Sequence, residues 1–256
     1  MNFDSLIRDR YNREARLMPA LLVSLPALLA VFVWFPSLRT AVPTLLAVLG
    51  FCGVTVWIAH LARSLGTTLQ PKLFTAWGGQ PTVAALRHRD ALLPTELKAR
   101  YHAFLRKAVH GLALPSAEEE KRDEPAADRA YEAGCAWLLA QTRDKKNFAL
   151  LFEENVNYGF RRNFLAMKPI ALLVAITTLA ICGTLIFRMI NAGQQPSVEV
   201  AATAIIITIY IALVSILVRR DWVRSAATAY ARQLLAACDV LPTPTSPTSP
   251  RSRAKR

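Results

Sequence analysis

The residue types best suited to binding a charged ligand crowd into residues 148–169, FALLFEENVNYGFRRNFLAMKP. The two adjacent arginines could hold a phosphate group by paired hydrogen bonds, because a guanidinium presents its donors as a fork. The same arginines would suit anionic lipid headgroups beside a membrane span, which is the favoured interpretation, and a purely structural capping role is the third alternative. The candidate residues are Arg161, Arg162, Asn163, Tyr158 and Asn155.

Basic and histidine side chains form a second group earlier in the chain. Residues 87–90 read Arg-His-Arg-Asp, but side chains one or two positions apart on a helix do not face each other. His102, Arg106 and His110 recur at intervals of four and could share one face, which suits anion binding better than hydrolysis. A solvated amphipathic face explains the same spacing and is the favoured interpretation. The secondary binding candidates are Arg87, His88, Arg89, His102 and Arg106.

Familiar catalytic motifs are missing from the sequence. It contains no H-E-x-x-H, no phosphate-binding P-loop, no G-x-G-x-x-G and no G-x-S-x-G. Its four cysteines show no C-x-x-C or Cys/His spacing typical of a structural zinc site. We therefore expect no catalytic residues, no metal site and no cofactor. The minor alternative is a membrane-embedded lipid-modifying enzyme that uses His88 or His102.

The apolar residues, 53% of the chain, are concentrated in four runs that contain almost no charge. About 19 such residues cross roughly 30 Å of hydrocarbon at 1.5 Å per residue. Only short loops separate the first run from the second and the third from the fourth, so each pair must form a tight hairpin. The predicted spans are residues 17–35, 42–62, 169–187 and 200–218, which make up hairpins 17–62 and 169–218.

The distribution of basic residues predicts the orientation of these hairpins. The chain has 31 Lys and Arg against 18 Asp and Glu, yet the loops inside the two hairpins contain no basic residue except Arg39 and Arg188. The positive-inside rule therefore places both termini and the central region in the cytoplasm. This predicts a multi-pass protein of the bacterial inner membrane.

The predicted spans contain few side chains that could bind an ion or transfer a proton. His60 is their only side chain that titrates near neutral pH, and its place close to the end of the second span suits an interfacial residue. They contain no Asp, Glu, Lys or Arg, so a transporter is not expected. Small residues such as Gly50 and Gly183 favour close helix packing and a homo-oligomer, although packing within one chain explains them equally well.

The central region, residues 63–168, is long enough for a small cytoplasmic domain, and it shows no alternating strand pattern. We expect this domain to be all-helical. Lys98 and Arg106 lie mainly outside the apolar stripe of its strongest helix. Periodicity and proline positions predict helices over residues 81–89, 96–112 and 126–142.

The ends of the predicted helices also carry local signals. Ser116 with Glu119 three positions later resembles a capping box, and residues 116–128 otherwise read as a solvated loop or helix start. Residues 1–16 form a cytoplasmic N-terminal segment, and residues 219–241 a cytoplasmic helix. Residues 242–256 form a disordered basic tail of Pro, Thr and Ser, for which nucleic-acid binding has weak support.

The sequence thus predicts an all-α integral membrane protein with four transmembrane helices as two hairpins flanking a small helical cytoplasmic domain. The first functional hypothesis is a non-enzymatic protein whose basic domain senses an anionic ligand or protein partner and alters the packing of the spans, as in a pore-forming or membrane-perturbing stress or phage-defence effector. The alternative is a scaffold or assembly factor without conductance. The expected partners are anionic lipid headgroups, further copies of the chain, and a cytoplasmic protein or a phosphate-bearing small molecule.

Overall fold

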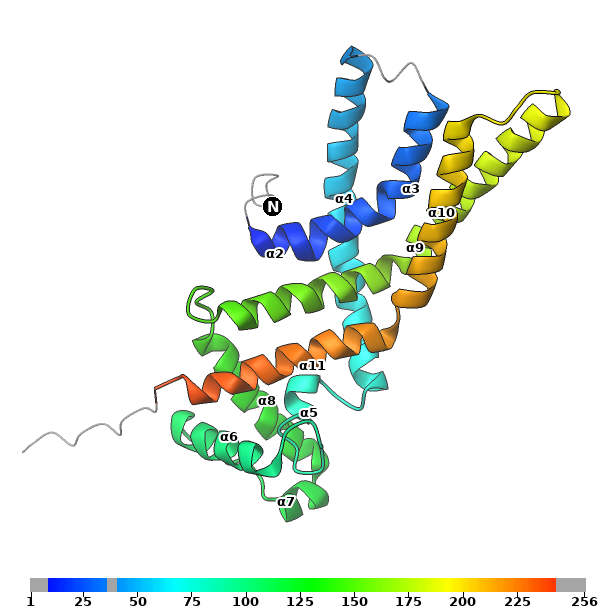
Figure 1. Ribbon diagram of the computed structural model, residues 1–256. Helices are drawn as coiled ribbons and strands as arrows, with labels where there is room; N and C mark the ends of the chain where they lie inside the picture. The colour runs from blue at the N-terminus through cyan, green and yellow to red at the C-terminus, as the bar shows by residue number, and fades with distance from the viewer. Residues whose placement is uncertain (1–8, 36–40, 243–256) are drawn as a thin grey trace, which may run out of the picture. The chain divides into compact units, whose positions relative to one another are not determined.

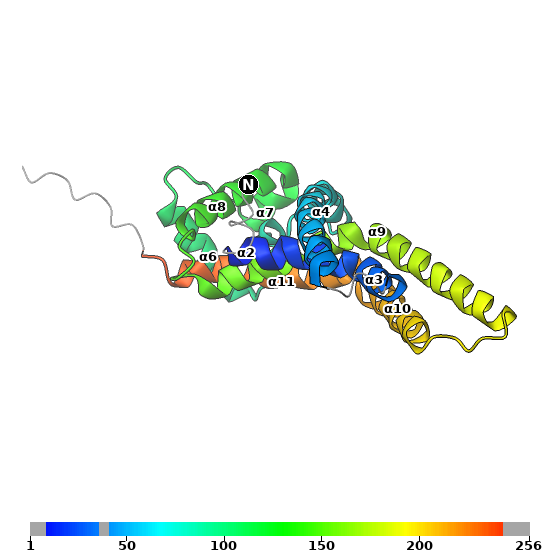
Figure 2. The same cartoon turned by 90° about the horizontal axis from the view of Figure 1, so that it is seen from above.

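The computed structural model describes residues 9–35 and 41–242, except the side chains of Phe32 and of residues 41–52. All regular secondary structure in these ranges is helical (Figures 1 and 2). The all-helical prediction is therefore confirmed for the described part of the chain. Arg39 and the tail from residue 243 onward lie outside it.

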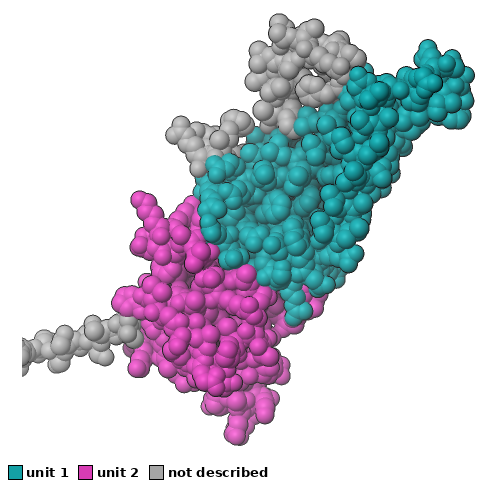
Figure 3. Space-filling view, in the orientation of Figure 1, with its two compact units in different colours: residues 1–73, 153–227 teal, residues 74–152, 228–256 magenta. Residues whose placement is uncertain are grey.

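The chain divides into two compact units (Figure 3). Unit 1 comprises residues 1–73 and 153–227, and unit 2 comprises residues 74–152 and 228–256. The predicted central domain, residues 63–168, therefore contributes its first and last residues to unit 1. Unit 2 instead draws on the C-terminal segment.

Unit 1 contains the apolar helices. Three of them are long and apolar enough to cross a membrane: residues 10–31, α9 and α10. The predicted second span lies within the long helix α4, but part of it falls on residues whose side chains are not described, and the four-span arrangement stays a prediction. The helices of this unit are α2 Arg10–Asn12, the π-helix η1 Arg13–Leu17, α3 Met18–Trp34, α4 Ala41–Ala76, α9 Ala149–Asn191, α10 Val198–Leu217 and the first turns of α11 Arg220–Ala236.

The core of unit 1 gathers residues from α3, α4, α9 and α10, or directly beside them. Val23, Ala62, Met167 and Val214 are buried together, and small or slender residues at these positions let the helices approach closely. Large apolar side chains on the outward faces of α9 and α10 remain exposed, as on helices that meet lipid. They include Leu173, Ile176, Phe187, Ile205, Ile209, Leu213 and Ile216.

Unit 2 is built from shorter helices that differ from the predicted ones mainly at their ends. The predicted helix 81–89 is helical only to Ala84 and continues as turns. The predicted helix 96–112 ends at Ala108, because the backbone of Val109 is already extended, with φ −105° and ψ 108°. The capping box is confirmed, since Ser116 and Glu119 exchange both hydrogen bonds. The helices are α5 Pro81–Ala84, α6 Thr95–Ala108, α7 Ala117–Arg122, α8 Glu124–Gln141 and the 3₁₀-helix η3 Ala237–Asp239, with the adjoining ends of α4, α9 and α11.

The C-terminal segment completes the core of unit 2. Leu234 and Leu235 are fully buried with Leu105, Tyr131 and Leu138 of α6 and α8. Removing the segment would open this core and leave those apolar side chains exposed to water. Residues 63–168 alone therefore lack part of the core that the structure builds.

Candidate functional site

The strongest sequence candidates lie on α9, where it meets two other helices of unit 1. Asn163 is only 1% exposed. Its Nδ2 donates to the Ala15 carbonyl at 2.7 Å, and its Oδ1 accepts from Nε and Nη2 of Arg162 at 3.2 and 3.1 Å. A buried amide satisfied in this way holds the N-terminal helix against α9.

Two glycines allow the helix backbones to come this close. A Cβ at Gly66 of α4 would lie 2.0 Å from the Asn163 Oδ1, and a Cβ at Gly159 of α9 would lie 3.0 Å from both the Ala15 Cβ and the Tyr11 Oη. Neither glycine has room for a side chain without a shift of its neighbours. We call this region the α9 junction; it comprises Ala15, Gly66, Gln70, Gly159, Arg162 and Asn163.

The two adjacent arginines point to different partners. Arg162 is buried, donates through Nη1 to the Gln70 Oε1 and lies over the ring of Tyr158. Arg161 donates to the Trp222 carbonyl and to the Ser225 Oγ, both at 2.9 Å, and lies over the Trp222 ring. Successive residues on a helix are about 100° apart, so these guanidinium groups do not form a joint cradle for one phosphate.

The remaining α9 candidate, Asn155, is half-buried and makes no side-chain hydrogen bond that joins it to this cluster. Near the same end of α9 runs a groove of about 500 Å³, lined by Arg10 and Glu14 on one side and by Glu153 and Glu154 on the other. Arg10 is already paired with Glu14 at 3.0 Å and with Glu153 at 3.2 Å. Three glutamates against one arginine make the groove unsuited to an anionic ligand.

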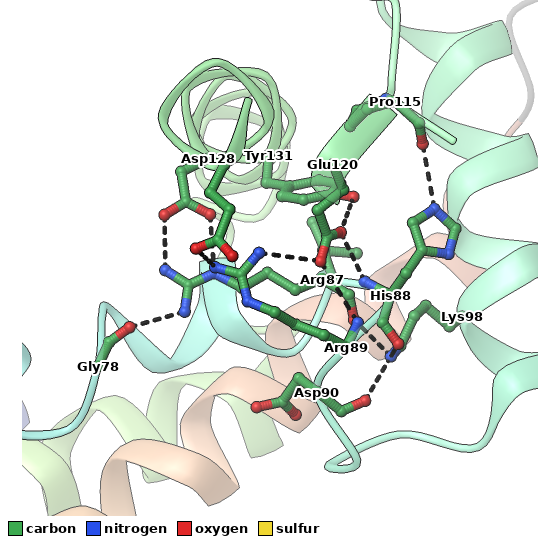
Figure 4. A network of polar contacts seen from close by, with 12 residues as sticks. Gly78, Arg87, His88, Arg89, Asp90, Lys98, Pro115, Glu120, Asp128 and Tyr131 are labelled. Carbon is green, nitrogen blue, oxygen red and sulfur yellow. Dashed lines mark hydrogen bonds and ion pairs between the residues drawn. The ribbon is translucent and has the colours of Figure 1, made fainter. Parts of the chain in front are cut away.

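The secondary candidates lie in unit 2, around the turn formed by residues 87–90 (Figure 4). Arg87 holds Asp128 of α8 through two hydrogen bonds, of 2.7 and 2.6 Å, and also donates to the Gly78 carbonyl. This paired geometry is the strongest form of an ion pair between arginine and a carboxylate. Arg87 thus ties the turn to α8.

A buried carboxylate holds the backbone of the same turn. Glu120 is only 2% exposed and accepts hydrogen bonds from the amide of His88 at 2.7 Å, from the side chain of Arg89 at 3.0 Å and from the Tyr131 hydroxyl at 2.7 Å (Figure 4). Burial would raise the pKa of Glu120, but the hydrogen bonds and Arg89 together lower it. Glu120 is therefore an ionised anchor for the turn.

Lys98 holds the turn from its carbonyl side. Its Nζ donates to the carbonyls of Arg87 at 2.5 Å and Asp90 at 2.6 Å, and the side chain is only 4% exposed (Figure 4). Burial lowers the pKa of the Lys98 ammonium, against the attraction of Asp90 and Glu120. The sequence places Lys98 mainly outside the apolar stripe of α6, but the structure buries it together with Tyr101 and Leu105, because the turn covers it. We call Glu120 and Lys98 with residues 87–90 the turn clasp.

His102 is also buried, so the interpretation of a solvated His102–Arg106–His110 face is wrong for its first member. Its Nε2 lies 2.8 Å from the Leu86 carbonyl, and burial lowers the pKa of the imidazole to about 4. Arg106 and His110 are exposed, and Arg106 donates to the Leu114 carbonyl. The structure brings together Arg87, His88, Arg89 and His102 through the clasp and its lining, but not Arg106.

Several residues of these clusters were not predicted from the sequence. Glu120 lies in a run of acidic residues whose other members are exposed, so the sequence does not single it out. The only signal is its hydrogen-bond partner Tyr131, which lies on the predicted apolar stripe of α8. No feature of the sequence predicted that Gly66 and Gln70 belong to the junction, because one sequence does not show which distant helix packs against a residue. The described residues contain no cluster of three or more His, Cys, Asp or Glu that could hold a metal ion.

No protein-family model, curated protein or solved structure matches this chain.

Proposed function

We propose that this chain is a non-enzymatic protein of the bacterial inner membrane with four spans and cytoplasmic termini, in which helix packing at the α9 junction controls the arrangement of the spans. The main support for this proposal is the position of the junction residues relative to the ends of the predicted spans. Ala15 precedes the first predicted span, Gly66 follows the second and Asn163 precedes the third, and the three are in contact. Two hairpins with all these ends on one side of the membrane account for that contact.

Contacts at the end of the fourth predicted span support the same topology. Lys168, just before the third predicted span, donates to the carbonyls of Ser215 and Val218 at the end of α10. The positive-inside rule assigns both of these ends to the cytoplasm. Reporter fusions should therefore be active on the outer side at residues 39 and 194, and on the cytoplasmic side at residue 110 and the C-terminus. A cytoplasmic signal at either hairpin loop would overturn the topology.

In this proposal the basic cytoplasmic region senses an anionic ligand or a protein partner and changes span packing, as a pore-forming or membrane-perturbing effector in stress or phage defence would. Arg161 and Arg162 serve this as helix connectors, because their guanidinium groups already donate to groups of α4, α9 and α11. Membrane potential, followed with a voltage-sensitive dye during stress or phage infection, tests it. Depolarisation should require the intact chain and should change in Gly159→Ala but not in Gly53→Ala, whose Cβ would meet no atom within 4 Å. No depolarisation under any condition would remove the pore version.

The second candidate function is a scaffold that recruits a cytoplasmic protein without conducting ions. It is favoured by an open groove of about 390 Å³ in unit 2, lined mainly by small apolar residues including Ala113, Ala126 and Ala130. A pull-down should use the full chain in detergent, because residues 63–168 lack Leu234 and Leu235 of the unit 2 core. A single stoichiometric partner without depolarisation would favour the scaffold.

A further inference from the structure

The end of α10 combines exposed apolar and exposed basic side chains over a few residues. Leu213, Ile216 and Leu217 are more than half exposed. The helix ends at Leu217, and the exposed Arg219 and Arg220 follow at once. Such a sequence suits a boundary between hydrocarbon and headgroups.

The first turns of α11 present the basic side chains on one face. Val223, Ala226 and Ala227 are buried in unit 1, whereas Arg220 and Arg224 are exposed. Residues four apart lie on the same side of a helix, so these two guanidinium groups lie near each other. Asp221 is also exposed, which leaves three arginines against one aspartate at this bend.

The bend between α10 and α11 is held by other cations. Lys168 binds the Ser215 and Val218 carbonyls, and Arg161 binds the Trp222 carbonyl while lying over the Trp222 ring. The carbonyls at the end of α10 would otherwise lack donors. The side chains of Arg219, Arg220 and Arg224 form no hydrogen bond or ion pair with other described residues.

We infer that Arg219, Arg220 and Arg224 form a binding surface for the headgroups of anionic phospholipids. The inference rests on the proposed membrane insertion and replaces Arg161 and Arg162 as the lipid-binding residues. Charge complementarity and the adjoining apolar side chains favour a lipid over a free phosphate, because a lipid satisfies both at once. The surface takes the inner-leaflet lipid that surrounds the fourth span.

The test counts phosphatidylglycerol retained by the full chain in a neutral detergent, by native mass spectrometry. The triple variant R219Q/R220Q/R224Q should reduce retention at least tenfold. The variant K107Q/R122Q/R129Q makes the same charge change at exposed basic positions of unit 2 and should retain lipid within twofold of the wild type. Replacing the three arginines of the surface by lysine should restore most of the retention, which separates lost charge from misfolding.

Each contrary result of the lipid-retention test would overturn a specific claim. Equal retention in the wild type and R219Q/R220Q/R224Q would overturn the surface, as would equal retention of phosphatidylcholine. Full competition by glycerol 3-phosphate would show a phosphate site instead of a lipid surface and would also overturn it. Failure of the wild-type chain to fractionate with membranes would overturn the proposed function itself, whereas a membrane-bound chain without lipid selectivity would overturn this inference alone.

Discussion

The α9 junction and the turn clasp both hold arginine side chains, but these arginines have different partners. In the clasp, Arg87 and Arg89 are paired with the carboxylates of Asp128 and Glu120. In the junction, Arg162 donates to the amide oxygens of Gln70 and Asn163. The clasp is thus neutralised within the protein, whereas the junction keeps its positive charge, as suits a region predicted to lie beside an anionic membrane surface.

The largest expected effect is at the buried carboxylate of the clasp. Glu120→Ala removes the acceptor of two backbone amides, the Tyr131 hydroxyl and Arg89. Breaking a buried charge network of this kind should destabilise unit 2 by about 3–5 kcal/mol. Hydrogen exchange of residues 85–131, followed by mass spectrometry, measures this loss.

Glu118→Ala is the matched control, because Glu118 is exposed on the same helix α7. It should change the stability by no more than about 1 kcal/mol, through the helix dipole. Equal effects of the two substitutions would show that the burial of Glu120 does not matter for the stability of unit 2. That result would contradict the comparison between the turn clasp and the α9 junction.

Acid should destabilise the clasp through His102. The pKa of the folded imidazole is about 4, below its ordinary value of 6.5, so the unfolded chain takes up a proton that the folded protein resists. Stability is therefore complete above pH 6.5 and should fall by up to about 3 kcal/mol as the pH drops to 4. The pKa of Glu120 is also lowered, from 4.5, so its contribution is complete above about pH 4.5 and is lost only as the pH falls below that value.

Hydrogen exchange of unit 2 between pH 7 and pH 4, corrected for the intrinsic exchange rate, measures this dependence. His102→Gln should flatten the profile in that window, and His110→Gln, at an exposed position just beyond the same helix, is the control. A profile as steep in His102→Gln as in the wild type would contradict the assignment.

In the junction, packing rather than charge should dominate. Gly66→Ala forces a Cβ toward the Asn163 Oδ1 and should destabilise unit 1 by about 1–3 kcal/mol. Gly53→Ala, on the same helix α4, meets no atom within 4 Å and should be neutral or stabilising by up to about 1 kcal/mol. Thermal unfolding of the full chain in detergent distinguishes them, and a neutral Gly66→Ala would show that the close approach is not needed.

The sequence predicted elements better than contacts. Uncharged runs and helical periodicity located the longer helices, and the Ser116–Glu119 capping box was correct, because these features depend on neighbours within a few residues. The short helix α7, Ala117–Arg122, was instead read as a solvated loop or helix start. The burial of Lys98 and His102 could not be predicted, since it depends on a turn that packs over α6 from elsewhere in the chain. For the same reason the sequence grouped Arg161 with Arg162, although their partners come from different helices.

The smallest expected effect concerns the second carboxylate of Arg89. Glu124 lies 2.9 Å from the Arg89 Nη2, but more than half of its side chain is exposed, and solvent screens such a pair. Glu124→Gln should therefore change the stability of unit 2 by less than about 1 kcal/mol, and 1 M salt should remove most of the difference. The same salt should leave most of the Glu120→Ala loss, because a buried hydrogen-bonded charge is poorly screened. Hydrogen exchange of both variants at low and high salt makes the comparison, and equal salt sensitivity would mean that water reaches Glu120 as freely as Glu124.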